Sequence, residues 1–431
     1  MIDFTLSKEQ HQLRAGAAAF AEAHLRPARE AYSQHATQEA RFRATRPAYE
    51  AAVQAGLIKG QVPAALGGSA QGLVDAAILV EEFFAVEPSA ALTILGTGLG
   101  LTPFIIAASE EQRARLLPPF LSGEGAPLAS FVHSEPGGTA NWLERGAKGL
   151  GTTARREGGA WVVSGEKMWT TNSGGWDGKG ADLQCVVCRH SDSEDGGPPD
   201  PARDPAGDIL ILLVTPDVIA ANEPGAYEVL GEQELAGFPS ASGPHSRFTN
   251  LRVPGANLLC PPGKGAQVVE QTFGSSAALV GAMGVGIMRA AFDAALKFAG
   301  EDTRGGSAPV LGRQSVADLL IDIKIRAEAG RLLTWKALHA IENGPGGWKA
   351  RLELALEAKI YSSEAAVQSV VDAMKAVGIT SYAKTQPFSR LLNDAMVLPI
   401  FDGGNVGVRR RQIEKIFQDA GYQPWEATYG S

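Results

Sequence analysis

The chain has 431 residues, a formal net charge of −8 and a hydrophobic fraction of 45%, which is typical of a globular protein of two or three domains. With 51 Gly and 25 Pro it is not collagen-like or of low complexity, and without extended basic clusters it is not expected to bind nucleic acid or an anionic membrane. Three cysteines exclude a disulfide framework, and the first residues lack the basic and then apolar order of a signal peptide. We therefore expect a cytoplasmic protein.

The first part of the chain, 1–126, is predicted to be a helical domain. Ser7 followed by apolar residues at helical spacing predicts a first helix that ends near Pro27, and the same pattern predicts helices over 47–55 and 73–86. The uncharged segment 88–109 is long enough to cross a bilayer. Because it contains three glycines and an internal proline, Pro103, we expect a buried pair of helices there instead.

A β domain is predicted over 127–264 and a helical bundle over 265–431. Short apolar runs bounded by Gly-rich turns predict strands at the start of the β domain, and 190–208 has the composition of an exposed loop. These runs are 128–132, 160–164, 183–189 and 209–215. Segment 267–299 is rich in small residues, which permit close helix packing and predict the central helix of the bundle. The expected fold is α+β and mainly α, in the order helices, β domain, helices.

Several apparent motifs lack the context that would give them a function. The glycines of 96–100 and 281–286 neither follow a strand nor open a helix with dinucleotide spacing, so they are predicted to serve packing. Cys185 and Cys188 form a CxxC within an apparent strand, without the second pair that a zinc site would need. The histidines show no metal-binding spacing, so no metal site is predicted.

Two loops of the predicted β domain have the residues expected of a flavin site. Loop 131–141 follows a strand and combines hydroxyls, glycines and backbone amides, which suit the pyrimidine edge and the pyrophosphate. Loop 164–174 contains Trp169, whose flat indole can pack on a flat cofactor, followed by hydroxyl residues that can hydrogen-bond a ring nitrogen. Either loop alone could be an ordinary turn, but together they favour a flat heterocyclic cofactor.

In these loops and in the order of its regions, the chain resembles the acyl-CoA dehydrogenase superfamily over essentially its whole length. The likeness extends to the segments 302–304 and 375–378. It implies a homotetramer that binds FAD, with cofactor contacts shared between subunits. The FAD contacts that the resemblance implies are Phe131, His133, Ser134, Gly138, Thr139, Trp169, Thr171, Arg304, Arg313, Gln314, Lys375, Ala376, Gly378 and Gly404.

Within the superfamily the chain resembles the nitroalkane oxidases. The catalytic Glu that is usual in the superfamily is replaced by Asp402, which opens the segment Asp-Gly-Gly-Asn as in that family. Further likeness lies in 133–142, 173–177, 243–245 and 425–430. The chain departs from the family pattern at Thr171, which keeps the hydroxyl of a serine, and at Leu398, which stands in place of a tyrosine near the base.

The resemblance implies oxidation of a small neutral nitroalkane by dioxygen to an aldehyde or ketone, with release of nitrite and hydrogen peroxide. Asp402 would remove the proton beside the nitro group, and the carbanion would add to flavin N5. Arg409, seven residues on, could share a helical face with Asp402, orient it and keep it ionised. Ser276 would hydrogen-bond near the flavin or the substrate.

Plainer interpretations of these three residues stay open. Asp402 could be a turn or capping aspartate, Arg409 a surface arginine and Ser276 a packing serine. Two other functions are also open. A true acyl-CoA dehydrogenase would use Asp402 on a thioester and pass electrons to an electron-transfer flavoprotein. A scaffold without activity would keep the fold for protein contacts and bind no flavin.

Overall fold

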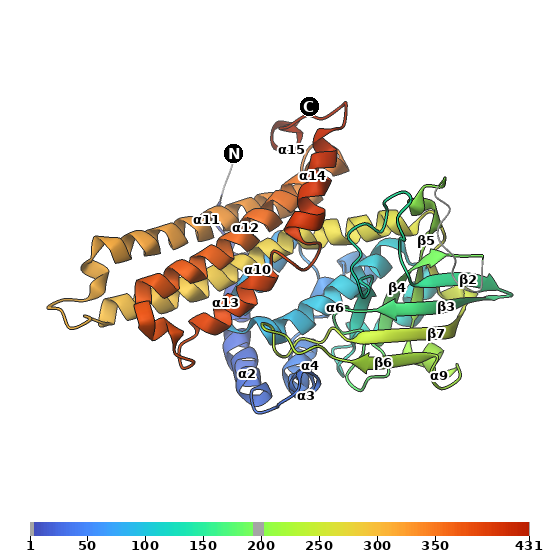
Figure 1. Ribbon diagram of the computed structural model, residues 1–431, viewed down its shortest axis with the longest axis horizontal. Coiled ribbons are helices and arrows are strands. Elements are labelled where there is room, and N and C mark those ends of the chain that lie inside the picture. Colours follow the sequence, from blue (N-terminus) through green and yellow to red (C-terminus); the bar gives the residue numbers. More distant parts are fainter. Residues whose placement is uncertain (1–3, 193–201, 431) are drawn as a thin grey trace.

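The computed structural model describes residues 4–192 and 202–430, and within these ranges helices, a β-sheet and a helical bundle follow one another along the chain (Figure 1). This order confirms the predicted fold class. Helix α8 (Pro118–Leu121) precedes β1 (Ala129–Val132), and β8 (Leu258–Cys260) precedes α10 (Gly265–Glu301). Residues 193–201 of the predicted loop 190–208 lie outside the described residues.

The N-terminal helices begin at a side-chain cap. The Gln10 backbone N–H donates to Ser7 Oγ at 3.1 Å, and the Ser7 N–H donates to Gln10 Oε1 at 3.0 Å, so each side chain satisfies the backbone N–H of the other residue.

The predicted end of the first helix near Pro27 is wrong. The chain stays helical through Pro27, which follows a π-helical turn over Ala21–Leu25 that is closed by a bond from the Arg26 N–H to the Ala21 oxygen. The helical segments here are α1 (Lys8–Phe20), η1 (Ala21–Leu25), α2 (Arg26–Tyr32), α3 (Gln38–Ala44), α4 (Arg46–Gln54), η2 (Lys59–Gln61), η3 (Ala64–Leu66), α5 (Leu73–Val86), α6 (Pro88–Ala107) and α7 (Glu110–Leu116).

Helix α6 is one helix and not the predicted pair, since Pro103 is accommodated inside it. It lies so close to β1 that a Cβ added at Gly100 would stand 2.3 Å from the Ser130 backbone nitrogen. By length and composition alone α6 and α10 could each cross a membrane, but 56% and 61% of their apolar windows are buried inside the protein. Burial of this extent is typical of core helices.

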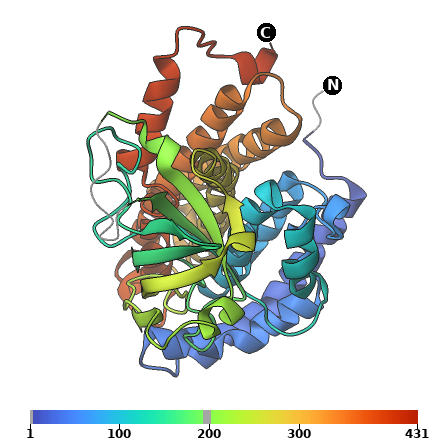
Figure 2. The same ribbon diagram turned by 90° about the vertical axis from the view of Figure 1, so that its right-hand side faces the viewer.

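The described strands form one mixed sheet at one end of the molecule (Figures 1 and 2). The order is β6-β7-β3-β2-β4-β5-β8, with β1 parallel to β4. The four predicted strands are confirmed, and four others with more polar or shorter runs were missed. The remaining bounds are β2 (Thr153–Glu157), β3 (Ala160–Lys167), β4 (Leu183–His190), β5 (Ile209–Val214), β6 (Tyr227–Gly231) and β7 (His245–Pro254), with the short helical segments η4 (Pro205–Asp208), α9 (Pro216–Ala220) and η5 (Gly255–Asn257) between them.

Helix α10 is the centre of the C-terminal bundle, as its small residues predict. Cβ atoms added at Gly281, Gly284 and Gly286 would lie 2.4 to 2.7 Å from atoms of α11, α12 and α5. Figure 1 shows α10 starting beside the sheet and ending at the opposite end of the molecule. The bundle comprises α10, η6 (Val310–Gly312), α11 (Gln314–Asn343), α12 (Trp348–Val377), η7 (Gly378–Tyr382), α13 (Phe388–Val397), η8 (Asn405–Arg409), α14 (Arg410–Phe417) and α15 (Glu426–Tyr429).

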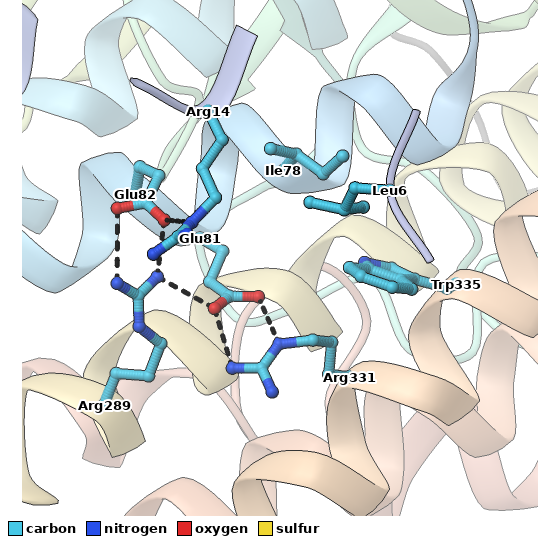
Figure 3. Close-up of a pocket in the computed structure, with 8 residues that line it drawn as sticks. All are labelled: Leu6, Arg14, Ile78, Glu81, Glu82, Arg289, Arg331 and Trp335. Carbon is cyan, nitrogen blue, oxygen red and sulfur yellow. Dashed lines mark hydrogen bonds and ion pairs between the residues drawn. The ribbon is translucent and has the colours of Figure 1, made fainter. Parts of the chain in front are cut away.

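An ion-pair cluster joins the N-terminal helices to the bundle (Figure 3). Glu81 accepts from Arg289 and Arg331, both at 2.8 Å, and Glu82 accepts from Arg14 at 2.7 Å and from Arg289 at 2.8 Å. These residues line a cavity that contains none of the predicted site residues. The cluster therefore links α1, α5, α10 and α11 away from the predicted active site.

Candidate active site

The predicted base lies in a strained turn between α13 and η8. Asp402 has a φ of +51° and Gly403 a φ of +73°, so two consecutive residues are left-handed. This conformation is unfavourable for a residue with a side chain, and such strain persists where the surroundings impose it. The Asp402 side chain is only 8% exposed. The turn therefore directs a carboxylate into the protein.

Ser276 and Arg409 both contact this carboxylate. Ser276 Oγ, on α10, donates to Asp402 Oδ1 at 2.8 Å, and Arg409 Nη2 lies 3.3 Å from Asp402 Oδ2. Arg409 Nε also donates to the Asp402 backbone oxygen at 2.9 Å. The structure thus brings together the three residues named as catalytic, and Arg409, with a side chain 2% exposed, is not a surface arginine.

Asp402 and Arg409 come into contact in a different way from the one that their spacing predicts. The seven-residue spacing predicts that both residues share one face of a helix, but Asp402 precedes the helix and only Arg409 belongs to it, at the end of the π-helical turn η8. The left-handed residues 402 and 403 reverse the chain, and the long arginine side chain reaches back to the turn.

Opposing effects act on the pKa of Asp402. Burial raises it, because a low-dielectric surrounding disfavours the charged form. The charges of Arg409 and Lys359 and the hydrogen bond from Ser276 act in the opposite direction, and burial has the larger effect. The carboxyl is therefore a stronger base than an ordinary aspartate while cations remain beside it.

The two predicted flavin loops are tied to each other by a buried ion pair. Lys167 Nζ donates to Glu135 Oε1 at 2.9 Å and to the His133 backbone oxygen at 2.9 Å. The Met168 backbone N–H donates to the Ser134 oxygen at 2.9 Å, which adds a second link. Trp169, the next residue, is left-handed and 53% exposed, an unusual state for a tryptophan. The indole is thus presented on the surface of the loop.

Phe273 connects the first loop to the base. Its ring centroid lies 5.0 Å from that of Phe131 and 5.5 Å from that of His133. Its backbone oxygen lies 3.2 Å from Ser276 Oγ and accepts from Arg409 Nη2 at 3.3 Å. The flavin loop and the residues around Asp402 therefore adjoin the same side chain. Phe273 is not among the residues predicted from the sequence, since a phenylalanine on a helix carries no signal beyond its place three residues before Ser276.

Comparison with known proteins agrees with this arrangement. Residues 7–124 and 263–417 match the models of the N-terminal and C-terminal acyl-CoA dehydrogenase domains. A nitroalkane oxidase of Fusarium oxysporum is 56% identical over 432 residues, which covers 100% of this chain and 98% of that protein. The chain belongs to the nitroalkane oxidase family.

Solved structures of nitroalkane oxidases match with TM-scores of 0.98 and 55% identity over 100% of both chains. One is an active-site mutant, D402N, crystallised with 1-nitrooctane. Another addresses the roles of Arg409 and Asp402 in the reaction of that flavoprotein. This chain has Asp and Arg at the same numbers.

The first loop fits the flavin of a nitroalkane oxidase. His133 is buried, and its Nε2 has no hydrogen-bond partner among the described residues. Burial lowers the pKa of His133 to about 3, so the imidazole is neutral and can donate or accept a single hydrogen bond. Gly138 is left-handed at φ +89° with no atom near a would-be Cβ, which leaves the loop backbone accessible. An unpartnered nitrogen in one loop and an exposed indole in the other suit a polar, flat ring.

A second group of predicted FAD contacts lies far from this loop. Arg304 donates to the Ala376 oxygen, and a Cβ added at Gly378 would be 3.3 Å from Arg304 Nη2, so these residues form a second group. Roughly 38 Å of α10 separates Ser276 from the end of the helix at Glu301. Figure 1 shows the segments that follow α10 and α12 at the end of the bundle away from the sheet. A single chain therefore does not bring the two groups together.

The remaining predicted residues are placed as follows. Thr139 and Thr171 lie in the two loops and are half-buried, and the Thr171 backbone oxygen accepts from Ser130 Oγ at 2.7 Å. Gly404 follows the strained turn. Arg313 and Gln314 are exposed at the start of α11, and exposed Lys375 pairs with Asp372. Leu398, in place of the family tyrosine, is fully buried and therefore supplies packing without a hydroxyl.

Proposed function

We propose that this chain oxidises small neutral nitroalkanes with FAD and dioxygen, yielding an aldehyde or ketone together with nitrite and hydrogen peroxide. The observation that carries the proposal is the position of Asp402. A carboxylate that is almost fully buried accepts a hydroxyl hydrogen bond, faces a guanidinium and adjoins the flavin loop through Phe273.

The chemistry of the substrate matches this base. A nitro group makes the neighbouring C–H far more acidic than a thioester does, so a carboxylate suffices to remove the proton. Aspartate is one methylene shorter than the glutamate that is usual in the superfamily. The carboxylate and the substrate carbon therefore meet at a different depth in the active site. This difference suits a compact nitro compound better than a thioester held by coenzyme A.

Each group around the base has a defined part in proton removal. Oδ1 of Asp402 holds the hydrogen bond from Ser276, whereas Oδ2 has the longer contact with Arg409, so Oδ2 is the atom that takes the proton. Arg409 orients the carboxylate and favours its ionised form.

The chain's own loops hold the cofactor in this proposal. Trp169 would pack against the flat ring of FAD, and His133 and Thr171 would supply hydrogen bonds to its polar edges. FAD, when bound, supplies the acceptor for the electron pair that proton removal leaves on the substrate.

A second copy of the chain completes the cofactor site. The group around Arg304 lies too far along α10 for one cofactor to reach both it and Trp169 in the same chain. We therefore infer a homotetramer in which the second group of one subunit contacts the FAD of another. Light scattering of the holoenzyme should give four times the chain mass, and Arg304→Ala should weaken FAD retention without removing Asp402 from its contacts.

The function is tested by two substrates. Purified protein is mixed with nitroethane or with butyryl-CoA, while flavin bleaching, nitrite and hydrogen peroxide are followed. Bleaching and nitrite with nitroethane alone are expected. Bleaching by the thioester alone would mean that the chain is an acyl-CoA dehydrogenase, and protein that holds no flavin would mean an inactive scaffold. A series of primary nitroalkanes then gives the chain-length preference.

A further inference from the structure

Lys359 is a buried ammonium directly beneath the turn that carries the base. It lies in the middle of α12 and is 0% exposed. Its Nζ donates to the Gly403 backbone oxygen at 3.0 Å and to Asn405 Oδ1 at 2.7 Å. Lys359 is not among the site residues predicted from the sequence.

The two left-handed residues of the turn are each held by a buried cation. Arg409 donates to the backbone oxygen of Asp402, and Lys359 donates to that of Gly403. Asn405 extends the second attachment, because its Nδ2 donates to Ser363 Oγ at 3.0 Å on α12. A turn that is unfavourable by itself is thus fixed to the bundle from both sides.

An uncharged side chain could donate the same hydrogen bonds, so the positive charge of Lys359 needs an explanation of its own. Burying an ammonium is costly unless an opposite charge compensates it. The charged groups that act on Lys359 are Asp402, Arg409 and Glu364. Of the two carboxylates, Asp402 acts more strongly on Lys359 than Glu364, which also pairs with Arg410 at 3.0 Å, so Asp402 is the main compensating charge.

We propose that Lys359 is a positioning residue for proton abstraction, which holds the Asp402 turn through Gly403 and lowers the proton affinity of the base by its charge. The inference rests on the proposed function. Burial lowers the pKa of Lys359 to about 8, so below that pH the side chain is an ammonium that can act on Asp402.

Two variants separate the charge from the hydrogen bond. Lys359→Gln keeps a donor and removes the charge, and Lys359→Met removes both at similar length. The pH profile of kcat/KM is measured with neutral nitroethane and with preformed ethyl nitronate. Both variants should raise the pKa of the base by about one unit with nitroethane. Lys359→Met should in addition lower the high-pH plateau about tenfold, since an unheld turn misplaces the base.

The controls distinguish positioning from general stability. Lys349→Gln changes the same charge on the same helix at a side chain that is 69% exposed, and its profile should match the native one. Nitronate needs no proton abstraction, so its oxidation should be unchanged in every variant. Nitrite release by the native enzyme tests the function itself, and only the difference between variants tests the role of Lys359.

A second readout does not depend on activity. Thermal unfolding of the holoenzyme is compared for the native chain, Lys359→Gln, Asp402→Asn and the double variant. If Lys359 compensates the carboxylate, its replacement lowers Tm more when Asp402 is present than when it is Asn. Equal losses in both backgrounds, or an unshifted pKa in both Lys359 variants, would overturn the proposal.

Discussion

Lys167 and Glu135 form a buried ion pair, 2.9 Å between Nζ and Oε1, that fastens one of the two predicted flavin loops to the other. Lys167 ends β3 and has no exposed surface, while Glu135 also accepts from the backbone N–H groups of Gly151 and Thr152 at 2.6 and 2.9 Å. Every acceptor contact of this carboxylate therefore serves to hold the loop that carries His133 and Gly138.

Lys167→Met should weaken FAD binding at least tenfold and lower the free energy of unfolding by about 3 kcal/mol, because it leaves Glu135 buried without its cation. Fluorescence titration of the apoprotein with FAD and chemical unfolding measure the two effects. Lys179→Met, at an exposed lysine of the same domain, is the control and should change neither. Unaltered FAD affinity in Lys167→Met would show that the pair does not order the loops.

Asp402→Asn should keep FAD and lose proton abstraction from neutral nitroethane by several orders of magnitude, since the amide is not a base. Preformed nitronate should still be oxidised at a similar rate, because its proton is already gone. Stopped-flow measurement of flavin bleaching with both substrates checks this. Equal losses on the two substrates would mean that Asp402 is not the base.

The pH dependence of kcat/KM reports the environment of Asp402. Activity on a neutral nitroalkane needs the ionised carboxylate, so it is lost as pH falls through the pKa of Asp402. Since burial raises that pKa, the loss begins at higher pH than for an ordinary aspartate. Ser276→Ala removes a hydrogen bond to the charged form and should raise this pKa by about one unit.

Ser275→Ala is the matched control for this measurement. The Ser275 hydroxyl donates to the Gln271 oxygen of its own helix, so its removal should leave the pH profile unchanged. A shift of similar size in both serine variants would indicate a disturbance of α10 rather than the loss of a contact to Asp402.

A substitution at Gly100 tests the contact between α6 and the sheet. Gly100→Ala should lower the free energy of unfolding by at least about 2 kcal/mol, because its Cβ would overlap the backbone of β1. Gly16→Ala, at an exposed position of α1 with nothing within 4 Å, should instead raise it by up to about 1 kcal/mol. Chemical denaturation of the two variants compares them, and a tolerated Gly100→Ala would mean that α6 can move away from β1.

The sequence by itself determined the order of the regions, because apolar periods of helix and strand are local properties. The Ser7 cap, the small residues of α10 and the apolar runs of β4 and β5 all predict what they form. It also supplied Asp402, Arg409 and the two flavin loops, though as residues of a family pattern rather than as a geometry.

Only the tertiary structure decided how those residues meet. The seven-residue spacing between Asp402 and Arg409 predicts a shared helical face, whereas two left-handed residues and a reaching side chain make the contact. Phe273 and Lys359 come from α10 and α12, and their relation to the turn depends on helix packing over long sequence separation. Local pattern carries no information on such contacts, because burial and charge compensation arise only when distant segments pack together.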